Sequence, residues 1–208
     1  DHSYLRMSTP PRNWQSTGLY APADQILVVT VSNATASDLS AVYIQIGVHT
    51  DRLKPTSGNV VNAGAFLRYP DVTTKVKLEP GVNLVRSPYG GTVLLVAEQS
   101  VNQIIDITIA TAVETPRFVA GQTSEAEWLL RRTAPAPWAE FESELAVAHV
   151  PSAEIRTLSY QDAAALAQQC LWHRGNCQPL FALCPGAALW QLPAGGRKHL
   201  CRRPGPPG

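Results

Sequence analysis

A series of short segments in which apolar and polar residues alternate, between residues 26 and 118, limits the folds open to this chain more than any other feature. Val42, Ile44 and Ile46, for example, alternate with Tyr43 and Gln45. A period of two is typical of a strand with one buried and one wet face. This pattern predicts strands at AVYIQIGV (41–48), VTTKVKL (72–78) and IIDITIA (104–110). The apolar runs ILVVTV (26–31) and TVLLVA (92–97) are also predicted as strands, because runs of this length fit buried strands.

Turn sequences separate these strands. Proline presets a negative φ and glycine accepts a positive one, so the clusters at 22–24, 79–81 and 87–91 are each predicted to be turns, and Gly90-Gly91 to lead into a strand. Strands joined by turns, without helices between them, favour an antiparallel arrangement over a parallel α/β sheet. We therefore predict a mainly β protein with a jelly-roll-like β-sandwich over residues 1–121.

The pattern changes after Gly121. Ser124 and Glu127 have the spacing of a capping box, which predicts a helix over about 124–132, and Ser159 with Asp162 predicts a second helix from 159 onward. Residues 138–151 between them are expected to be extended. We assign residues 122–169 to a linker helix and the start of a second, α/β domain.

The composition changes again at Gln169. All four cysteines of the chain follow this residue and all sixteen acidic residues precede it, so that residues 1–169 carry a net charge of −4 and residues 170–208 a charge of +5. The simplest interpretation is a reading-frame change near codon 169. Because this stretch is rich in Pro and Gly, we predict that it stays disordered. Its cysteines, Cys170, Cys177, Cys184 and Cys201, lack the short spacings of a structural zinc site.

Several classes of function are disfavoured. Residues 1–169 have no basic stripe of the kind that nucleic-acid binding requires, and no apolar run approaches the roughly 18 residues of a membrane-spanning helix. The first residues show no charged region followed by an apolar one, so we expect any secretion signal to lie upstream of them.

Three segments, in this order and spacing, resemble the enhancin-like, mucin-targeting zinc metallopeptidase family. They are RNWQSTGLYAP (12–22), IGVHTDRL (46–53) and SPYGG (87–91), and APWAE (136–140) with VPS (150–152) fits the continuation. The resemblance covers roughly residues 10–168.

The resemblance implies a β-sandwich that leads into a gluzincin-type catalytic domain acting on glycoproteins such as mucins, in a secreted or cell-surface protein. Such a domain holds Zn²⁺ with a His-Glu-x-x-His helix and a further Glu. The five histidines of this chain (His2, His49, His149, His173 and His199) are isolated, and no pair has that spacing. We therefore expect a truncated catalytic domain without catalytic or metal-binding residues, inactive as given, with zinc only in the intact family domain.

Two aromatic residues are candidates for binding a glycan. Trp14 and Tyr20 flank Thr17-Gly18 and could offer flat surfaces to the apolar faces of sugar rings. The alternative, which we favour, is that both rings serve as core or lid packing, because large aromatic side chains contribute much buried area.

The loop after the strand at 41–48 is the second candidate. His49, Asp51 and Arg52 place an imidazole, a carboxylate and a guanidinium within four residues at the end of a strand, where a rigid fold presents functional groups. An ordinary solvated turn is the alternative that we favour. With Trp14 and Tyr20, this loop defines a second possible function for the whole chain, a standalone carbohydrate-binding or adhesion module.

Glu140, Glu142 and Glu144 alternate along a predicted extended segment, so their carboxylates should share one face. They could bind Ca²⁺ or act as acid and base. The interpretation that we favour is a solvated edge strand, because charges there discourage edge pairing.

Overall fold

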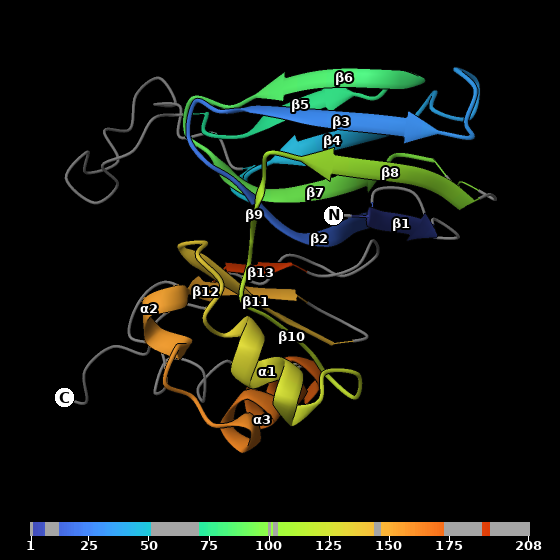
Figure 1. The fold of residues 1–208 in the computed structure, drawn as a ribbon. Helices are drawn as coiled ribbons and strands as arrows, with labels where there is room; N and C mark the ends of the chain where they lie inside the picture. The colour runs from blue at the N-terminus through green and yellow to red at the C-terminus, as the bar shows by residue number, and fades with distance from the viewer. Residues whose placement is uncertain are drawn as a thin grey trace, which may run out of the picture. The chain divides into compact units, whose positions relative to one another are not determined.

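The computed structural model describes residues 2–6, 13–50, 71–99, 101, 104–143, 147–172 and 189–191, with the backbone alone for 2–6, 13, 169–172 and 189–191. The chain divides into two compact units, Asp1–Val113 and Glu114–Gly208 (Figure 1). Strands make up most of the regular structure and most strand pairs are antiparallel. The prediction of a mainly β fold is confirmed.

The first unit contains two sheets. Sheet A has the order β1-β8-β3-β6 and sheet B the order β5-β4-β7-β2-β9. The pairs β1–β8, β3–β8, β3–β6, β2–β7, β4–β7 and β4–β5 are all antiparallel. The strands are β1 (His2–Arg6), β2 (Asn13–Ala21), β3 (Ile26–Ser32), β4 (Val42–Ile46), β5 (Thr74–Lys77), β6 (Gly81–Arg86), β7 (Gly91–Ala97), β8 (Ile104–Ala110) and β9 (Val113–Glu114).

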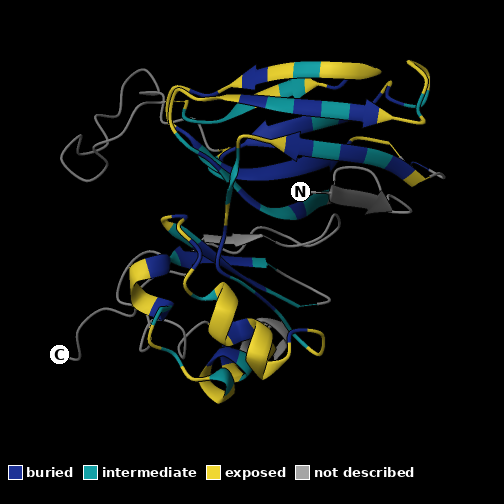
Figure 2. Ribbon diagram, viewed as in Figure 1, coloured by how far each residue is buried: buried dark blue, intermediate teal, exposed yellow. Residues whose placement is uncertain are grey.

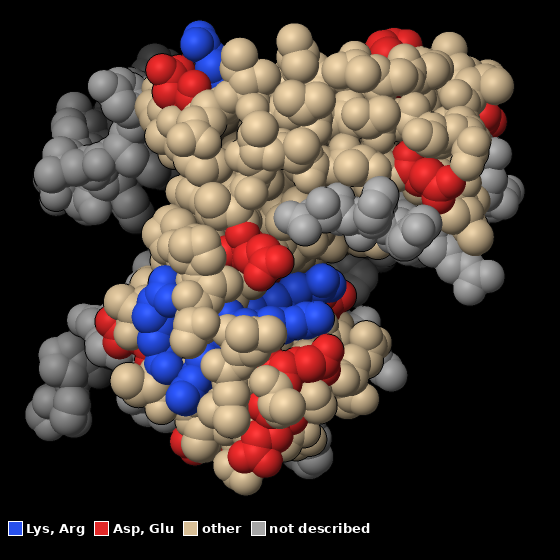
Figure 3. Space-filling model, in the orientation of Figure 1, with Lys and Arg blue, Asp and Glu red and all other residues tan. Residues whose placement is uncertain are grey.

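The inward faces of sheets A and B share one hydrophobic core. On β3, Leu27, Val29 and Val31 are buried, while Val28 and Thr30 between them are half-buried, so burial alternates along this strand (Figure 2). The other core residues include Val42, Ile44 and Ile46 of β4, Val93 and Leu95 of β7, and Ile105, Ile107 and Ile109 of β8. The face of this unit seen in Figure 3 carries few charged side chains.

The second unit is built around sheet C, with the order β10-β11-β12-β13. β10 is parallel to β11, and the other two pairs are antiparallel. Residues 117–119, which the sequence prediction included in the sandwich, thus form a strand of the second unit. The elements are β10 (Arg117–Val119), α1 (Glu125–Arg131), β11 (Trp138–Glu142), β12 (Val147–Pro151), α2 (Ser152–Ile155), α3 (Tyr160–Trp172) and β13 (Leu189–Gln191).

Helices cover one face of sheet C. Trp128 of α1 meets Phe118 of β10 edge-on, with 5.5 Å between ring centroids, and Phe141 of β11 at 5.7 Å. Ala163, Leu166 and Ala167 of α3 complete this core. The apolar residues of these strands face this cluster. The residues that alternate with them along each strand therefore point to the opposite face of sheet C.

Both predicted helix starts are confirmed. Ser124 caps α1 by accepting a hydrogen bond from the Glu127 N–H, and the Glu127 carboxylate accepts one from the Ser124 N–H in return. The Asp162 N–H donates to the Ser159 hydroxyl ahead of α3 at 3.1 Å.

The compositional break falls inside regular structure. α3 continues past Gln169 to Trp172, and Leu189–Gln191 pairs with β12. These six residues of the stretch expected to be disordered are therefore in a helix and a strand. The rest of that stretch lies outside the described residues, so its disorder stays a prediction. No helix in the described part of the chain is long and apolar enough to cross a membrane.

Candidate functional site

The three sequence segments that carry the family resemblance meet at one end of the sandwich. Gly91, at the start of β7, lies so close to Gly47 that a Cβ atom on Gly91 would be 2.7 Å from the Gly47 Cα. A Cβ on Gly90 would be 2.6 Å from the carbonyl oxygen of Ala21. Real Cβ atoms do not make such contacts, so the segment 87–91 ends in two glycines because backbone packs on backbone there.

Hydrogen bonds hold the chain at this end as far as His49. The Gly47 N–H donates to the Thr92 carbonyl at 2.9 Å, and the buried Gln45 amide donates to the Gly47 carbonyl at 2.9 Å. The Thr73 hydroxyl donates to the His49 carbonyl at 2.5 Å. His49 itself is half-buried. This end of the sandwich is therefore a defined surface up to His49.

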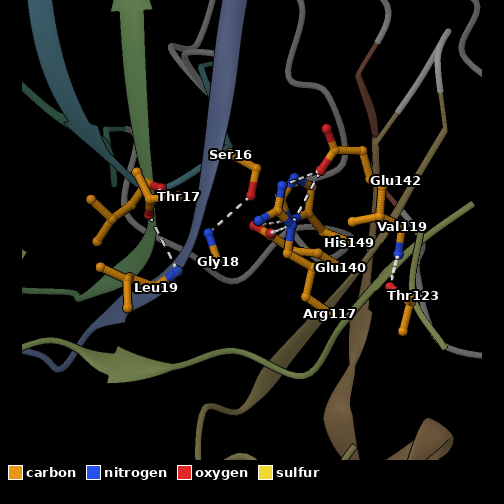
Figure 4. A network of polar contacts seen from close by, with 11 residues as sticks. Ser16, Thr17, Gly18, Leu19, Arg117, Val119, Thr123, Glu140, Glu142 and His149 are labelled. Carbon is orange, nitrogen blue, oxygen red and sulfur yellow. Dashed lines mark hydrogen bonds and ion pairs between the residues drawn. The ribbon is translucent and has the colours of Figure 1, made fainter. Parts of the chain in front are cut away.

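A bulge of two residues interrupts β2. Ser16 is opposite Leu94 of β7 and Leu19 is opposite the next residue, Val93, so Thr17 and Gly18 have no partner in the register. The Gly18 N–H donates to the Ser16 hydroxyl, and the Leu19 N–H donates to the Thr17 hydroxyl (Figure 4). The Thr17 hydroxyl in turn donates to the Val93 carbonyl of β7 at 2.7 Å. Because the insertion has an even number of residues, the strand continues with the same faces inward and outward.

The bulge decides where the two candidate aromatic residues lie. Trp14 is opposite Val96 and Tyr20 is opposite Thr92 on β7, so both side chains are on the outer face of sheet B, about 13 Å apart along the strand. Both are half-buried. Burial raises the pKa of Tyr20 above its ordinary value of 10.0. Packing in the sandwich core does not fit this face, because that core lies on the other side of sheet B; packing as a lid, the other half of the favoured interpretation, stays a prediction.

The predicted ligand-binding residues fall into two groups. Tyr20 and Gly47 both flank Thr92, so Tyr20 is at the same end of sheet B as the loop that contains His49. Trp14 is at the other end, where Tyr43 of β4 is also opposite Val96. Asp51 and Arg52 lie outside the described residues, and a role for them stays a prediction.

The second unit contains a row of ionisable side chains that crosses three strands of sheet C. Arg117 on β10 is opposite Glu140 on β11, and Glu140 is opposite His149 on β12. The Arg117 Nε lies 3.9 Å from Glu140 Oε2, and His149 Nδ1 lies 3.6 Å from Glu140 Oε1. Glu142 accepts two hydrogen bonds from Arg117, at 3.2 and 2.5 Å (Figure 4). We call these four residues the charged row.

Burial of the charged row corrects one prediction. The side chain of Glu140 is 0% exposed and that of His149 is 1% exposed. The favoured interpretation of Glu140 and Glu142 as part of a solvated edge is wrong, because β11 lies between β10 and β12 and is an interior strand. Glu144 lies outside the described residues.

The charged row does not fit the zinc ion that the resemblance implies. A catalytic zinc site needs three protein ligands with lone pairs free for the metal. Here the Arg117 guanidinium lies beside both carboxylates and already supplies the positive charge. Among the residues that the structure describes, no three His, Cys, Asp or Glu side chains gather as a metal-binding group.

The sequence contained a signal for the charged row. Ala139 and Phe141 alternate with Glu140 and Glu142, just as Ala148 and Val150 alternate with His149. If the apolar set faces the core, the polar set must share the other face of two neighbouring strands. What the pattern lacked was the register that places Glu140 directly opposite His149.

Two family models together match most of the chain. The model for the N-terminal domain of M60-like peptidases matches residues 3–110, and the model for peptidase M60, enhancin and enhancin-like proteins matches residues 111–183. The second match runs past Gln169, where the composition changes. The first match ends at residue 110, three residues before Val113, the last residue of the first compact unit.

Among curated proteins, TRPM8 channel-associated factor 1 from Bos taurus is 33% identical over 147 residues, which are 70% of this chain and 15% of that protein. The chain thus spans less than a fifth of the length of this relative.

Among solved structures, the M60 catalytic domain of Clostridium perfringens ZmpB with its CBM51 domains has a TM-score of 0.57 at 16% identity, covering 81% of this chain and 20% of that one. Pseudomonas aeruginosa IMPa in complex with an O-glycopeptide has a TM-score of 0.55 at 17% identity, covering 82% and 20%. At such identities the likeness establishes the fold alone.

Proposed function

Because the chain belongs to the family of M60-like, enhancin-like peptidases, we propose that it is the scaffold portion of a zinc metallopeptidase that acts on glycoproteins such as mucins. In this proposal the chain supplies the β-sandwich and a first part of the M60 domain. The residues that hydrolyse the peptide bond are not among these 208. The observation that carries this proposal is the order of the two family matches along one chain, the N-terminal domain at residues 3–110 followed directly by the peptidase M60 match at residues 111–183.

The spacing of the histidines and the contacts of the charged row support a scaffold role for this chain. In zinc peptidases the metal polarises the attacking water and the peptide carbonyl. The five histidines of this chain lack the i, i+4 spacing that holds such a metal on a helix. The charged row is occupied by internal ion pairs, which suits a role in fixing the register of sheet C.

The proposed substrate class rests on a neighbour in structure. IMPa of similar fold is solved in complex with an O-glycopeptide. We extend this class, O-glycosylated protein, to the whole protein of which these residues are the scaffold. A secreted or cell-surface location follows from such a substrate.

A direct assay tests the scaffold proposal. The purified 208-residue chain is incubated with mucin in the presence of zinc, alongside the ZmpB catalytic domain as an active reference, and the products are analysed by mass spectrometry. We expect no cleavage by the chain and far less than one zinc ion per molecule by elemental analysis. Stoichiometric zinc with mucin cleavage, abolished by a chelator, would overturn the proposal.

A glycan-binding module is the second candidate. It is supported by Tyr20 lying at the same end of sheet B as His49, with Trp14 farther along the same face. On a glycan array, a binding chain would lose signal on Tyr20→Ala but keep it on Ile104→Ala, which removes an exposed apolar side chain from the other sheet. Binding by the unaltered chain would favour this candidate over a pure scaffold.

Association with an ion channel is a third candidate, because the curated relative at 33% identity is named for association with TRPM8. Co-precipitation of the chain with TRPM8 from co-expressing cells, compared with an unrelated β-sandwich of similar size, tests it. Equal recovery of the two would exclude this candidate.

A further inference from the structure

The edge strands of the sandwich differ in how they are protected against pairing with another chain. Natural sheets protect their edges with charged side chains, especially Lys, or with very short strands. Among the described strands, β5 and β9 end sheet B. β5 carries Lys75 and Lys77, and β9 has only two residues.

β6 ends sheet A without such protection. Between Gly81 and Val85 it carries no charge, and the side chains of Val82 and Leu84 are each 67% exposed. Figure 2 shows the exposed colour along much of this strand. Val82 is opposite Thr30 and Leu84 is opposite Val28 on β3, so the surface beside the edge is uncharged as well.

We propose that β6 is a homodimer interface, at which it pairs antiparallel with β6 of a second copy of this chain. The four strands of sheet A in each copy then form one continuous sheet across a two-fold axis. This places the open hydrogen-bonding groups of the edge, and two exposed apolar side chains from each copy, in a single contact.

A second copy fits because the strand is complementary to itself. With Asn83 on the two-fold axis, Val82 of one copy is opposite Leu84 of the other, so the apolar side chains pair twice. A symmetric interface requires such self-complementarity. The neutral strand brings no like charges together, and the charge at its end, Arg86, has an ion pair with Asp24 of its own chain at 3.5 Å.

The turn before β6 holds the strand in place for this contact. The Asn83 amide donates to the Glu79 carbonyl at 2.8 Å, and its oxygen accepts from the Glu79 N–H at 2.9 Å. Pro80 and Pro88 flank the strand and lack the N–H needed to extend the pairing. The contact is therefore confined to six residues, about 20 Å of strand.

The size of the contact sets the expected strength. A standard stable interface buries about 800 Å² on each partner, more than a six-residue edge offers by itself. We therefore expect a dimer that forms at micromolar concentration and dissociates on dilution.

Sedimentation velocity on the full chain, with reductant to keep the four cysteines apart, tests the proposal. The mass should rise from one chain toward two between about 1 and 200 μM, the range in which weak complexes form. Val82→Lys with Leu84→Lys, which makes β6 resemble β5, should remain monomeric over that range. The matched control, Ile104→Lys with Leu130→Lys, also replaces two exposed apolar residues but leaves β6 unchanged, and should dimerise like the unaltered chain.

Hydrogen exchange of the unaltered chain gives a second readout that depends on no variant. Amides of residues 81–86 should exchange more slowly at high concentration than at low concentration, while those of β5 should not change. A monomer at every concentration would overturn the proposal. So would a dimer that the β6 variant forms equally well, or one that leaves exchange in residues 81–86 unchanged.

Discussion

Glu140 and His149 lie directly opposite each other on β11 and β12, and neither side chain is open to solvent. Burying a carboxylate costs free energy unless a positive charge or hydrogen bonds offset the loss of water. Arg117 lies on the other side of Glu140 and supplies such a charge. The polar face of sheet C therefore depends on three strands keeping one register.

Removal of the positive charge from the charged row should destabilise the second unit. Arg117→Met keeps much of the side-chain volume but leaves Glu140 without its cationic neighbour, and we expect a loss of about 3 kcal/mol in the free energy of unfolding. Urea unfolding followed by fluorescence of the buried Trp128 measures this. Arg131→Met, which breaks an exposed pair with Glu127 at 3.6 Å, is the control and should change stability by less than about 1 kcal/mol. Similar losses for both variants would contradict the assignment.

The backbone contact at the end of the sandwich predicts a large effect of one methyl group. Gly91→Ala would place a Cβ 2.7 Å from Gly47, so we expect a loss of about 3 kcal/mol or more in the unfolding free energy. Gly81→Ala is the matched control, since Gly81 also has a positive φ, of 86°, but open space around it, and should cost about 1 kcal/mol. Thermal unfolding of the two variants compares them. Equal unfolding midpoints for the two variants would show that Gly91 and Gly47 are not in close contact.

The indole of Trp128 should contribute both packing and a hydrogen bond. Its Nε1–H donates to the Leu158 carbonyl at 3.1 Å, and Arg132 also donates to that oxygen, at 2.9 Å. Because the oxygen keeps one donor, Trp128→Phe should cost only about 1 to 2 kcal/mol, whereas Trp128→Ala should cost about 3 to 5 kcal/mol. Urea unfolding followed by circular dichroism gives both values. An alanine variant no worse than the phenylalanine variant would refute the packing argument.

The capping box of α1 predicts a titration. Hydrogen bonds from the Ser124 backbone and side chain hold the pKa of Glu127 below its ordinary value of 4.5. A carboxyl group with a lowered pKa in the folded state stabilises the fold above its unfolded pKa, and this contribution is lost as the pH falls through the folded value. Ser124→Ala should raise the pKa of Glu127, as measured by NMR titration. An unchanged pKa of Glu127 in this variant would argue against the capping box.

Much of the fold could be predicted because it is encoded locally. The strands β4, β5 and β8 were predicted from alternation, β3 and β7 from short apolar runs, and the starts of α1 and α3 from the spacing of Ser with Glu or Asp. Each signal needs only neighbours within a few residues, so no knowledge of the tertiary structure was required.

The unpredicted features depend on contacts between distant residues. β6 was not predicted because it shows neither signal: Val82 and Leu84, its exposed residues, are as apolar as the buried Val85, and Asn83 interrupts the apolar run. The sequence also could not indicate that β11 is an interior strand, which decides that Glu140 is buried. Nor could it separate Trp14 from Tyr20, since their positions depend on the bulge in β2 and its register with β7.

The bulge in β2 also limits which changes in length this strand can tolerate. Loss of Gly18 alone would turn either Leu19 and Ala21 out of the core or Trp14 and Ser16 into it. Loss of Thr17 and Gly18 together would leave every remaining side chain on its present side. Insertions or deletions of two residues at this point should therefore be tolerated, whereas an insertion or deletion of one residue should abolish folding of the first unit.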